Sequence, residues 1–252
     1  MQQVDNELPD KKPCIQCGTL IALDGNFCNQ CGAKQFVEDH ISAKKTWNYL
    51  TQTGLFYGIS ITACALAKYA SIFETFSWGL FFDLILAINA IGFFAISWKE
   101  NQKILQWKSF SWSKLAAYSS IAMAASVLVH YSVGWLNLVI YSKDDNYYEQ
   151  LKGSIAGGLL VVSLTAVMPA IFEELGFRGY LLQTLLKITD KEQAVFISAF
   201  LFAILHFSFV SLFWLIPFAL FAGFVRIKEN TLWYGVFFHF CFNLTACIFE
   251  LL

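Results

Sequence analysis

Long stretches without a charged residue follow one another along the chain from residue 46 onward. They cover 46–67, 75–98 apart from Asp83, 115–142, 153–172, 193–225 and 231–249. An α-helix rises about 1.5 Å per residue, so about 20 residues are needed to cross about 30 Å of hydrocarbon. The stretch 193–225 is too long for one crossing, and we divide it near 207–211. The pattern therefore predicts about seven transmembrane helices.

The composition also favours a membrane protein. Of the 252 residues, 57% are hydrophobic and only 14% are charged, whereas soluble domains average about 25% charged residues. We therefore expect an all-α fold, a polytopic transmembrane helix bundle within the lipid bilayer. The formal net charge is -1, so the chain lacks the excess of basic residues that is typical of nucleic-acid binding. We therefore expect no nucleic-acid partner.

The charges between the apolar stretches predict an orientation. The loop at 99–114 carries Lys99, Lys103, Lys108 and Lys114, and lysine-rich loops stay on the cytoplasmic side. With seven spans, this places the N-terminus in the cytoplasm of a multi-pass protein of the cell membrane. No signal peptide is visible among the polar residues before 46, so the first span is expected to act as its own insertion signal.

Four cysteines near the N-terminus form a regular pattern. They are Cys14, Cys17, Cys28 and Cys31, arranged as C-x2-C-x10-C-x2-C, with Gly18 and Gly32 directly after the two pairs. Four thiolates bind Zn²⁺ tetrahedrally, and glycine permits the tight turn that directs backbone amides at the sulfurs. Two disulfides are the alternative, but they need an oxidising compartment. A closed four-cysteine site indicates structural zinc, and the segment resembles the zinc ribbons at the termini of many bacterial membrane proteins. Such a ribbon is also a candidate for binding a partner protein.

A cluster of charged residues follows the fourth apolar stretch and contains Glu173, Glu174 and Arg178. Ionised side chains at the edge of hydrocarbon are costly unless they are paired or solvated in a cavity, so they indicate a functional site. In a helix, Glu174 and Arg178 lie on one face at positions i and i+4, where they can neutralise each other. Glu173 is left without such a partner and is a candidate general base.

Three more polar residues lie in the later apolar stretches. They are His206, and His239 and Asn243, which are four residues apart and share one helix face. A glutamate and a histidine can together deprotonate water, while a second histidine and an asparagine can donate hydrogen bonds to the oxyanion of a tetrahedral intermediate. This set suits hydrolysis of an amide bond. Two histidines and a glutamate can equally form a catalytic zinc site, and the spacing does not decide between the two.

These residues resemble the three motifs of the CPBP family of intramembrane proteases, with E-E-x-x-x-R at 173–178, F-x-x-x-H at 202–206 and H-x-x-x-N at 239–243. That family, also called Abi or type II CAAX prenyl endopeptidase-like, includes CAAX-processing proteases and bacteriocin-associated membrane proteins. The resemblance covers roughly residues 153–252. It implies a membrane-embedded protease in which Glu173 and His206 activate water and His239 and Asn243 stabilise the oxyanion. Glu174 and Arg178 would have a supporting role, and no catalytic metal is assigned.

Together these patterns predict a zinc ribbon at 1–35, a linker at 36–46, N-terminal transmembrane helices at 47–152 and a catalytic core at 153–252. The expected substrate is a hydrophobic or membrane-associated peptide. One alternative is a catalytically inactive scaffold or immunity protein that binds a partner through its ribbon. A weaker one is a transporter, because intramembrane carboxylates and histidines also relay protons. Asp83 and Asn89 are expected to be interhelical hydrogen-bonding groups or part of a polar lumen.

The predicted active site sets a condition on the fourth helix. If that helix ended at Glu173, His206 would lie about 22 Å along the next helix and the two side chains would not meet. We therefore expect the fourth helix to continue past Pro169 towards Lys187 as a kinked element, because proline frees backbone groups where cavities form.

Overall fold

The computed structural model describes residues 11–22, 28, 30–33, 43–140 and 155–251. The chain divides into two compact units, Met1–Thr46 and Trp47–Leu252. Most of the predicted linker at 36–46 lies outside the described residues, as do 141–142 of the third predicted span and 153–154 of the fourth. The small unit contains strands β1 (Lys11–Pro13) and β2 (Leu20–Ala22), which pair antiparallel with Lys12 opposite Ile21.

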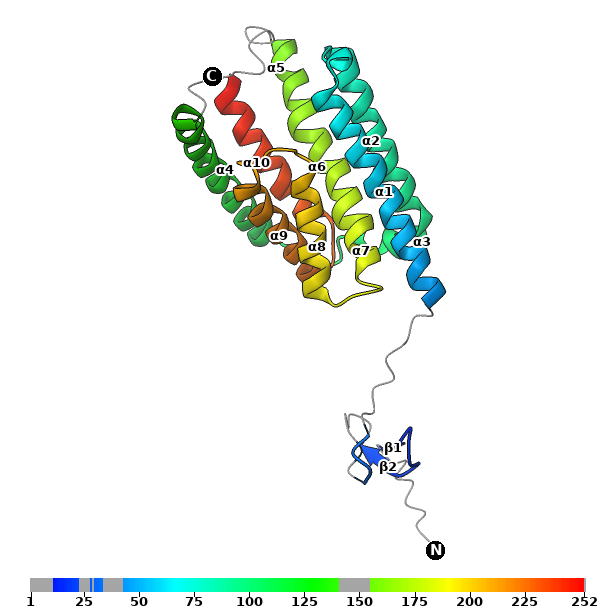
Figure 1. The fold of residues 1–252 in the computed structure, drawn as a ribbon. Coiled ribbons are helices and arrows are strands. Elements are labelled where there is room, and N and C mark those ends of the chain that lie inside the picture. Colours follow the sequence, from blue (N-terminus) through cyan, green and yellow to red (C-terminus); the bar gives the residue numbers. More distant parts are fainter. Residues whose placement is uncertain (1–10, 23–27, 29, 34–42, 141–154, 252) are drawn as a thin grey trace, which may run out of the picture. The chain divides into compact units, whose positions relative to one another are not determined.

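The large unit is helical (Figure 1). Its long elements are α1 (Ala43–Tyr69), α2 (Phe76–Ile96), α4 (Trp112–Ile140), α8 (Lys191–Ile204), α9 (Leu212–Glu229) and α10 (Trp233–Leu251), with the short elements η1 (Ser71–Phe73), α3 (Trp98–Asn101) and η2 (Gln102–Leu105) between them. Between α4 and α8 runs one uninterrupted helical segment, which we call the rod. It comprises α5 (Ile155–Val162), η4 (Ser163–Val167), α6 (Met168–Glu173), η5 (Glu174–Leu181) and α7 (Leu182–Leu185). The expected continuation of the fourth helix past Pro169 is therefore confirmed.

Within the described residues, four helices are long and apolar enough to cross a membrane. They are Lys44–Tyr69, Phe76–Ile96, Trp112–Leu136 and Gly157–Leu185, and Trp233–Phe249 is a shorter apolar helix. The predicted all-α membrane bundle is confirmed, and the described part of each predicted span falls on a helical segment. α8 has only 14 residues, or about 21 Å at 1.5 Å per residue, so it is shorter than a full crossing.

The predicted division of the longest apolar stretch is also confirmed, because α8 ends at Ile204 and α9 begins at Leu212. Phe207 between them has the left-handed φ of 48°. Lys68 of α1 donates from Nζ to the carbonyl oxygens of His206 and Phe207, both at 3.1 Å. These carbonyls follow the last turn of α8, where a cation is favourable. The end of α8 is thus tied to α1.

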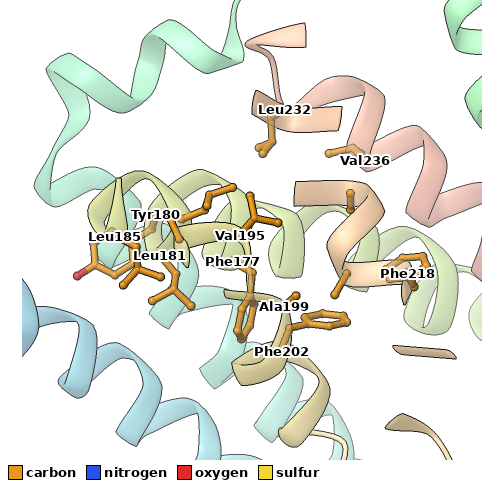
Figure 2. Packing of buried hydrophobic residues seen from close by; sticks show 14 of the residues in the cluster. Phe177, Tyr180, Leu181, Leu185, Val195, Ala199, Phe202, Phe218, Leu232 and Val236 are labelled. Carbon is orange, nitrogen blue, oxygen red and sulfur yellow. The ribbon is translucent and has the colours of Figure 1, made fainter. Parts of the chain in front are cut away.

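The rod packs closely against α1, α2 and α8. Phe177 and Tyr180 of the rod contact Phe56 of α1 with ring centroids 5.7 and 5.2 Å apart, and Phe177 contacts Phe202 of α8 at 5.2 Å. Figure 2 shows Phe177 beside Ala199 and Phe202 within this core. On the α2 side the rod has Gly179, where an added Cβ would lie 2.9 Å from the ring of Phe94. A small residue is therefore needed for this helix contact.

Replacing Gly179 by alanine is expected to destabilise the bundle. The new methyl group meets the buried Phe94 ring, and overpacking of this kind costs about 1–3 kcal/mol. The measurement is thermal unfolding of the purified protein in detergent. Gly92→Ala on α2 is the matched control, since a Cβ there has nothing within 4 Å and alanine favours a helix by about 1 kcal/mol. Equal melting temperatures for the two variants would contradict the packing argument.

Candidate active site

The rod is π-helical on both sides of the short helix that ends at Glu173. η4 precedes α6 and η5 follows it directly, beginning at Glu174. π-helical turns are rare and are frequent at functional sites, since they change the direction of the following side chains. Glu173 and Glu174 lie at the junction of α6 and η5 and, although adjacent in sequence, have very different surroundings, since Glu173 is 34% exposed and Glu174 is buried.

Glu174 and Arg178 form the predicted pair, and both side chains are almost fully buried, with 0% and 1% exposed. Glu174 Oε1 lies 3.0 Å from Arg178 Nη1. Arg178 also donates from Nη2 to the Ala219 carbonyl at 3.3 Å, and its guanidinium lies 4.5 Å from the centre of the Phe202 ring. A buried charge needs such partners because it has lost its hydration. The arginine therefore joins the rod to α8 and α9.

His239 of α10 contacts both glutamates. Its Nδ1 lies 3.1 Å from Glu174 Oε1 and its Nε2 lies 3.8 Å from Glu173 Oε2. A carboxylate accepts hydrogen bonds, so Nδ1 carries the proton that is donated to Glu174. The Nε2 atom is then directed at Glu173, and it can donate a hydrogen bond only when the ring carries both protons. Glu174 thus sets the orientation of the His239 ring.

Asn243 lies one helical turn after His239 and donates from Nδ2 to the Thr165 carbonyl at 2.9 Å. In a regular α-helix that carbonyl would accept from the backbone N–H of residue 169, but residue 169 is proline and has none. Thr165 lies in the π-helical η4, and the Asn243 amide gives its carbonyl a hydrogen-bond partner from α10. One amide hydrogen of Asn243 remains for another acceptor.

His206 follows α8 and is exposed. Its Nδ1 lies 3.2 Å from the Phe202 carbonyl. Because a carbonyl only accepts, Nδ1 is the protonated nitrogen, and Nε2 of the neutral ring is available as a proton acceptor. This is the tautomer that a general base needs.

A cavity of about 460 Å³ is lined by Glu173, His206, His239 and Asn243, together with Asp83. These side chains come from the rod, the end of α8, α10 and α2. The structure thus brings the four predicted catalytic residues to one space, while Glu174 and Arg178 lie buried behind it. A second cavity of about 210 Å³ shares Asp83, Glu173 and His206 and is otherwise mostly apolar.

Asp83 was expected to be a hydrogen-bonding group or part of a polar lumen, and it lines both cavities. The sequence signal for it was a single acidic residue in an otherwise uncharged stretch. Asn89 was correctly predicted as an interhelical hydrogen-bonding group, because its Nδ2 donates to the Phe56 carbonyl at 3.0 Å and to Ser60 Oγ at 2.9 Å, both on α1.

The four cysteines of the small unit lie together, with all four sulfur atoms within 4.8 Å of one another. Sγ of Cys14 is 3.6 Å from Sγ of Cys31, and Sγ of Cys17 is 3.7 Å from Sγ of Cys28. These separations exclude disulfides, which need about 2.05 Å. They match the spacing of about 3.8 Å between sulfurs that each lie about 2.3 Å from a tetrahedral Zn²⁺. The donor set therefore fits zinc.

The backbone around the cysteines prepares the sulfurs for metal binding. Gly18 and Gly32 have left-handed φ values of 75° and 73°, which glycine adopts without strain. Backbone N–H groups of Gln16 and Gln30 each donate to a cysteine sulfur, at 3.4 Å in both cases. Hydrogen bonds from the backbone of Cys17 and Gln16 lower the pKa of the Cys14 thiol to about 6, against the opposing effect of burial. The metal-binding thiolate form of Cys14 is therefore favoured at neutral pH.

Together the helices and the cavity define a class, the all-α, multi-pass membrane proteins with a polar cavity between their helices. Within this class, residues 155–245 match the family described as type II CAAX prenyl endopeptidase Rce1-like. The match confirms the predicted resemblance for this segment, which contains all six polar residues of the three motifs. α1, α2, α4 and the cysteine cluster lie outside it. No curated protein and no solved structure matches the chain.

Proposed function

We propose that the protein is an intramembrane endopeptidase that hydrolyses a peptide bond of a membrane-associated substrate. The observation that carries this proposal is the single cavity lined by Glu173, His206, His239 and Asn243. The family match supports it, since the matched family is described by a peptidase activity. The cavity combines a carboxylate, two imidazoles and an amide, which are the groups that hydrolysis of an amide bond by activated water requires.

In the proposed mechanism, Glu173 is the general base. Its side chain is 34% exposed, so water in the cavity can reach the carboxylate. The carboxylate removes a proton from water with the help of His206 Nε2, and the hydroxide forms a bond to the substrate carbonyl carbon. The protonated Glu173 then gives its proton to the leaving amine nitrogen as the carbon–nitrogen bond breaks.

The oxyanion of the tetrahedral intermediate is stabilised by Asn243 and His239. Asn243 offers its remaining amide hydrogen, since the other is donated to Thr165. His239 donates from Nε2 in its doubly protonated form, while Glu174 holds Nδ1–H. Donors that are held in place before the reaction stabilise developing charge without reorganisation. Glu174 and Arg178 therefore act as positioning residues in this mechanism.

The test of hydrolysis is a cleavage assay with purified protein in lipid vesicles. A panel of transmembrane and lipidated peptides is incubated with the protein, and products are identified by mass spectrometry. We expect at least one peptide to be cut at a defined bond. If the protein cuts none of them, the inactive scaffold that binds a partner becomes the better interpretation.

We propose that the four cysteines hold one structural Zn²⁺ and that no catalytic metal takes part. Among the described residues, the cysteines are the one group of at least three potential ligands brought close enough for a metal ion. A site with four protein ligands has no open position for substrate. We also propose that the N-terminus is cytoplasmic, where thiols stay reduced, and that the ribbon is the surface for any protein partner.

Zinc content tests this assignment. We expect inductively coupled plasma mass spectrometry to find about one Zn²⁺ per chain. The double variant Cys14→Ser/Cys17→Ser should lose this zinc, because two of its ligands are removed. Cys241→Ser, a cysteine outside the cluster, is the control and should keep the zinc. A second zinc that is lost in His206→Ala would overturn the metal-free mechanism, as would inhibition by a chelator in the variant that already lacks the ribbon zinc.

A further inference from the structure

Asp83 is the one ionisable residue of α2, and it lines both cavities beside Glu173 and His206. Its side chain is exposed, and the structure gives it no hydrogen bond or ion pair among the described residues. A carboxylate in an apolar span is unfavourable without a partner, and such residues usually face a cavity and a substrate or ion path. Asp83 is therefore a group whose partner is expected to enter from outside the chain.

No lysine or arginine among the described residues lines these cavities, and the one cation that the proposed mechanism places there, doubly protonated His239, lies beside Glu173. Arg178 is buried and paired with Glu174, and it lines neither cavity. Lys68 donates its Nζ hydrogens to two backbone carbonyls at the end of α8. The other ionisable groups that line the cavities are Cys64 and the two histidines. The space around Asp83 and Glu173 therefore attracts positive charge.

The rest of the wall is mostly apolar. Phe56, Leu86, Phe172, Phe177 and Leu205 line the smaller cavity next to Asp83. Such a wall suits a hydrophobic peptide segment, and the rings of phenylalanines can also contact a cation. Phe56 and Leu86 come from α1 and α2, which lie outside the family match. This part of the cavity wall is thus formed by helices that lie outside the segment matched to the family.

From this arrangement we propose that Asp83 is a specificity residue, which binds a cationic group carried by an otherwise hydrophobic substrate segment, close to the bond that is cut. The chemical class of the group is an ammonium or guanidinium, from a lysine or arginine side chain or from a free peptide N-terminus. The proposal rests on the proposed peptidase function for its position relative to the cut bond. The ion pair between Asp83 and this group would hold the substrate carbonyl near Glu173.

The experiment compares matched peptides that differ in one residue. In a peptide that the protein cuts, a single lysine is moved through the positions on either side of the cut bond, with norleucine at the same place as the uncharged counterpart. Further peptides carry arginine in place of lysine, or a free or an acetylated N-terminus. These peptides distinguish the sources of the positive charge. A hydrogen bond to a charged group contributes about 1.5–3 kcal/mol, so we expect kcat/KM to favour one cationic peptide by at least about tenfold over its norleucine counterpart.

Variants of Asp83 test whether this residue causes the preference for the cationic peptide. In Asp83→Asn, which keeps the shape and removes the charge, the ratio of the two kcat/KM values should fall to about 1. Asp83→Glu keeps the charge and should retain part of the preference. A wild-type protein without any preference, or an Asp83→Asn variant that keeps it, would overturn the proposal. Unfolding temperatures show that the variants are folded.

A binding measurement distinguishes two outcomes: that Asp83 does not bind the cationic group, and that the protein is not a peptidase. The same peptides, with a fluorescent label, are titrated into the Glu173→Gln protein, and anisotropy is measured. Tighter binding of the cationic peptide that is lost on adding Asp83→Asn supports the role of Asp83 even if no peptide is ever cut. Cleavage without any charge preference supports the peptidase and rejects the role of Asp83.

Discussion

Replacing Glu173 by glutamine lowers the rate of peptide cleavage by about 10²–10⁴-fold, the range that general-base catalysis contributes, while the protein stays folded. Glutamine has the size of glutamate but does not accept the proton from water. The side chain is 34% exposed in the cavity and lies 3.8 Å from His239 Nε2, so little packing depends on its charge. We expect kcat to carry the loss, because the base acts in the transition state and not in substrate binding.

The assay uses the peptide that wild type cuts, with products quantified over the same time course. Glu192→Gln is the matched control, since Glu192 is an exposed glutamate in the first turn of α8 and lines neither cavity. It should cleave like wild type. Cleavage by Glu173→Gln at the wild-type rate would reject the proposed mechanism.

Removing one member of the buried pair is expected to have the largest effect on stability. In Glu174→Gln the guanidinium of Arg178, 1% exposed, stays buried without its carboxylate, and such a loss costs about 3–5 kcal/mol. The Nδ1–H of His239 also loses its charged acceptor, because glutamine offers only a neutral amide oxygen in that place. We therefore expect a lower melting temperature and, in any protein that remains folded, slower cleavage.

A double-mutant cycle isolates the pair. Glu174→Gln combined with Arg178→Gln should be less destabilising than the sum of the two single variants, because no uncompensated charge remains. Equilibrium unfolding in mixed micelles is the measurement. The control is Glu100→Gln, which removes an ion pair with Lys187 in which the glutamate side chain is 55% exposed; exposed pairs contribute about 0–1 kcal/mol. Additive single effects would show that the two buried residues do not stabilise each other.

Much of the helical architecture follows from local patterns. The uncharged stretches predicted where helices lie, and the division near 207–211 was correct because the apolar run was too long for one crossing. The pairing of Glu174 with Arg178 follows from the spacing of four residues alone. The spacing of the cysteines and the glycines after them likewise predicted the cluster.

Other features of the site depend on residues that are far apart in the chain. The bond from Asn243 to the Thr165 carbonyl joins α10 to the rod, and no periodicity relates these two positions. The orientation of His239 depends on Glu174, which is 65 residues earlier. For Lys68, the sequence offered no sign of its contact with the end of α8.

The order of residues alone was sufficient to predict a membrane-spanning helical protein, the cysteine cluster and the set of polar residues to which we assign the proposed chemistry. These depend on hydrophobicity and on spacings within single helices, which act over a few residues. The tertiary structure decided that the polar residues share one cavity, that Asp83 from α2 joins them, and which atom each ring and amide presents there. The physical reason is that helix packing sets these relations, through contacts such as Phe94 against Gly179, and packing depends on side chains from several helices at once.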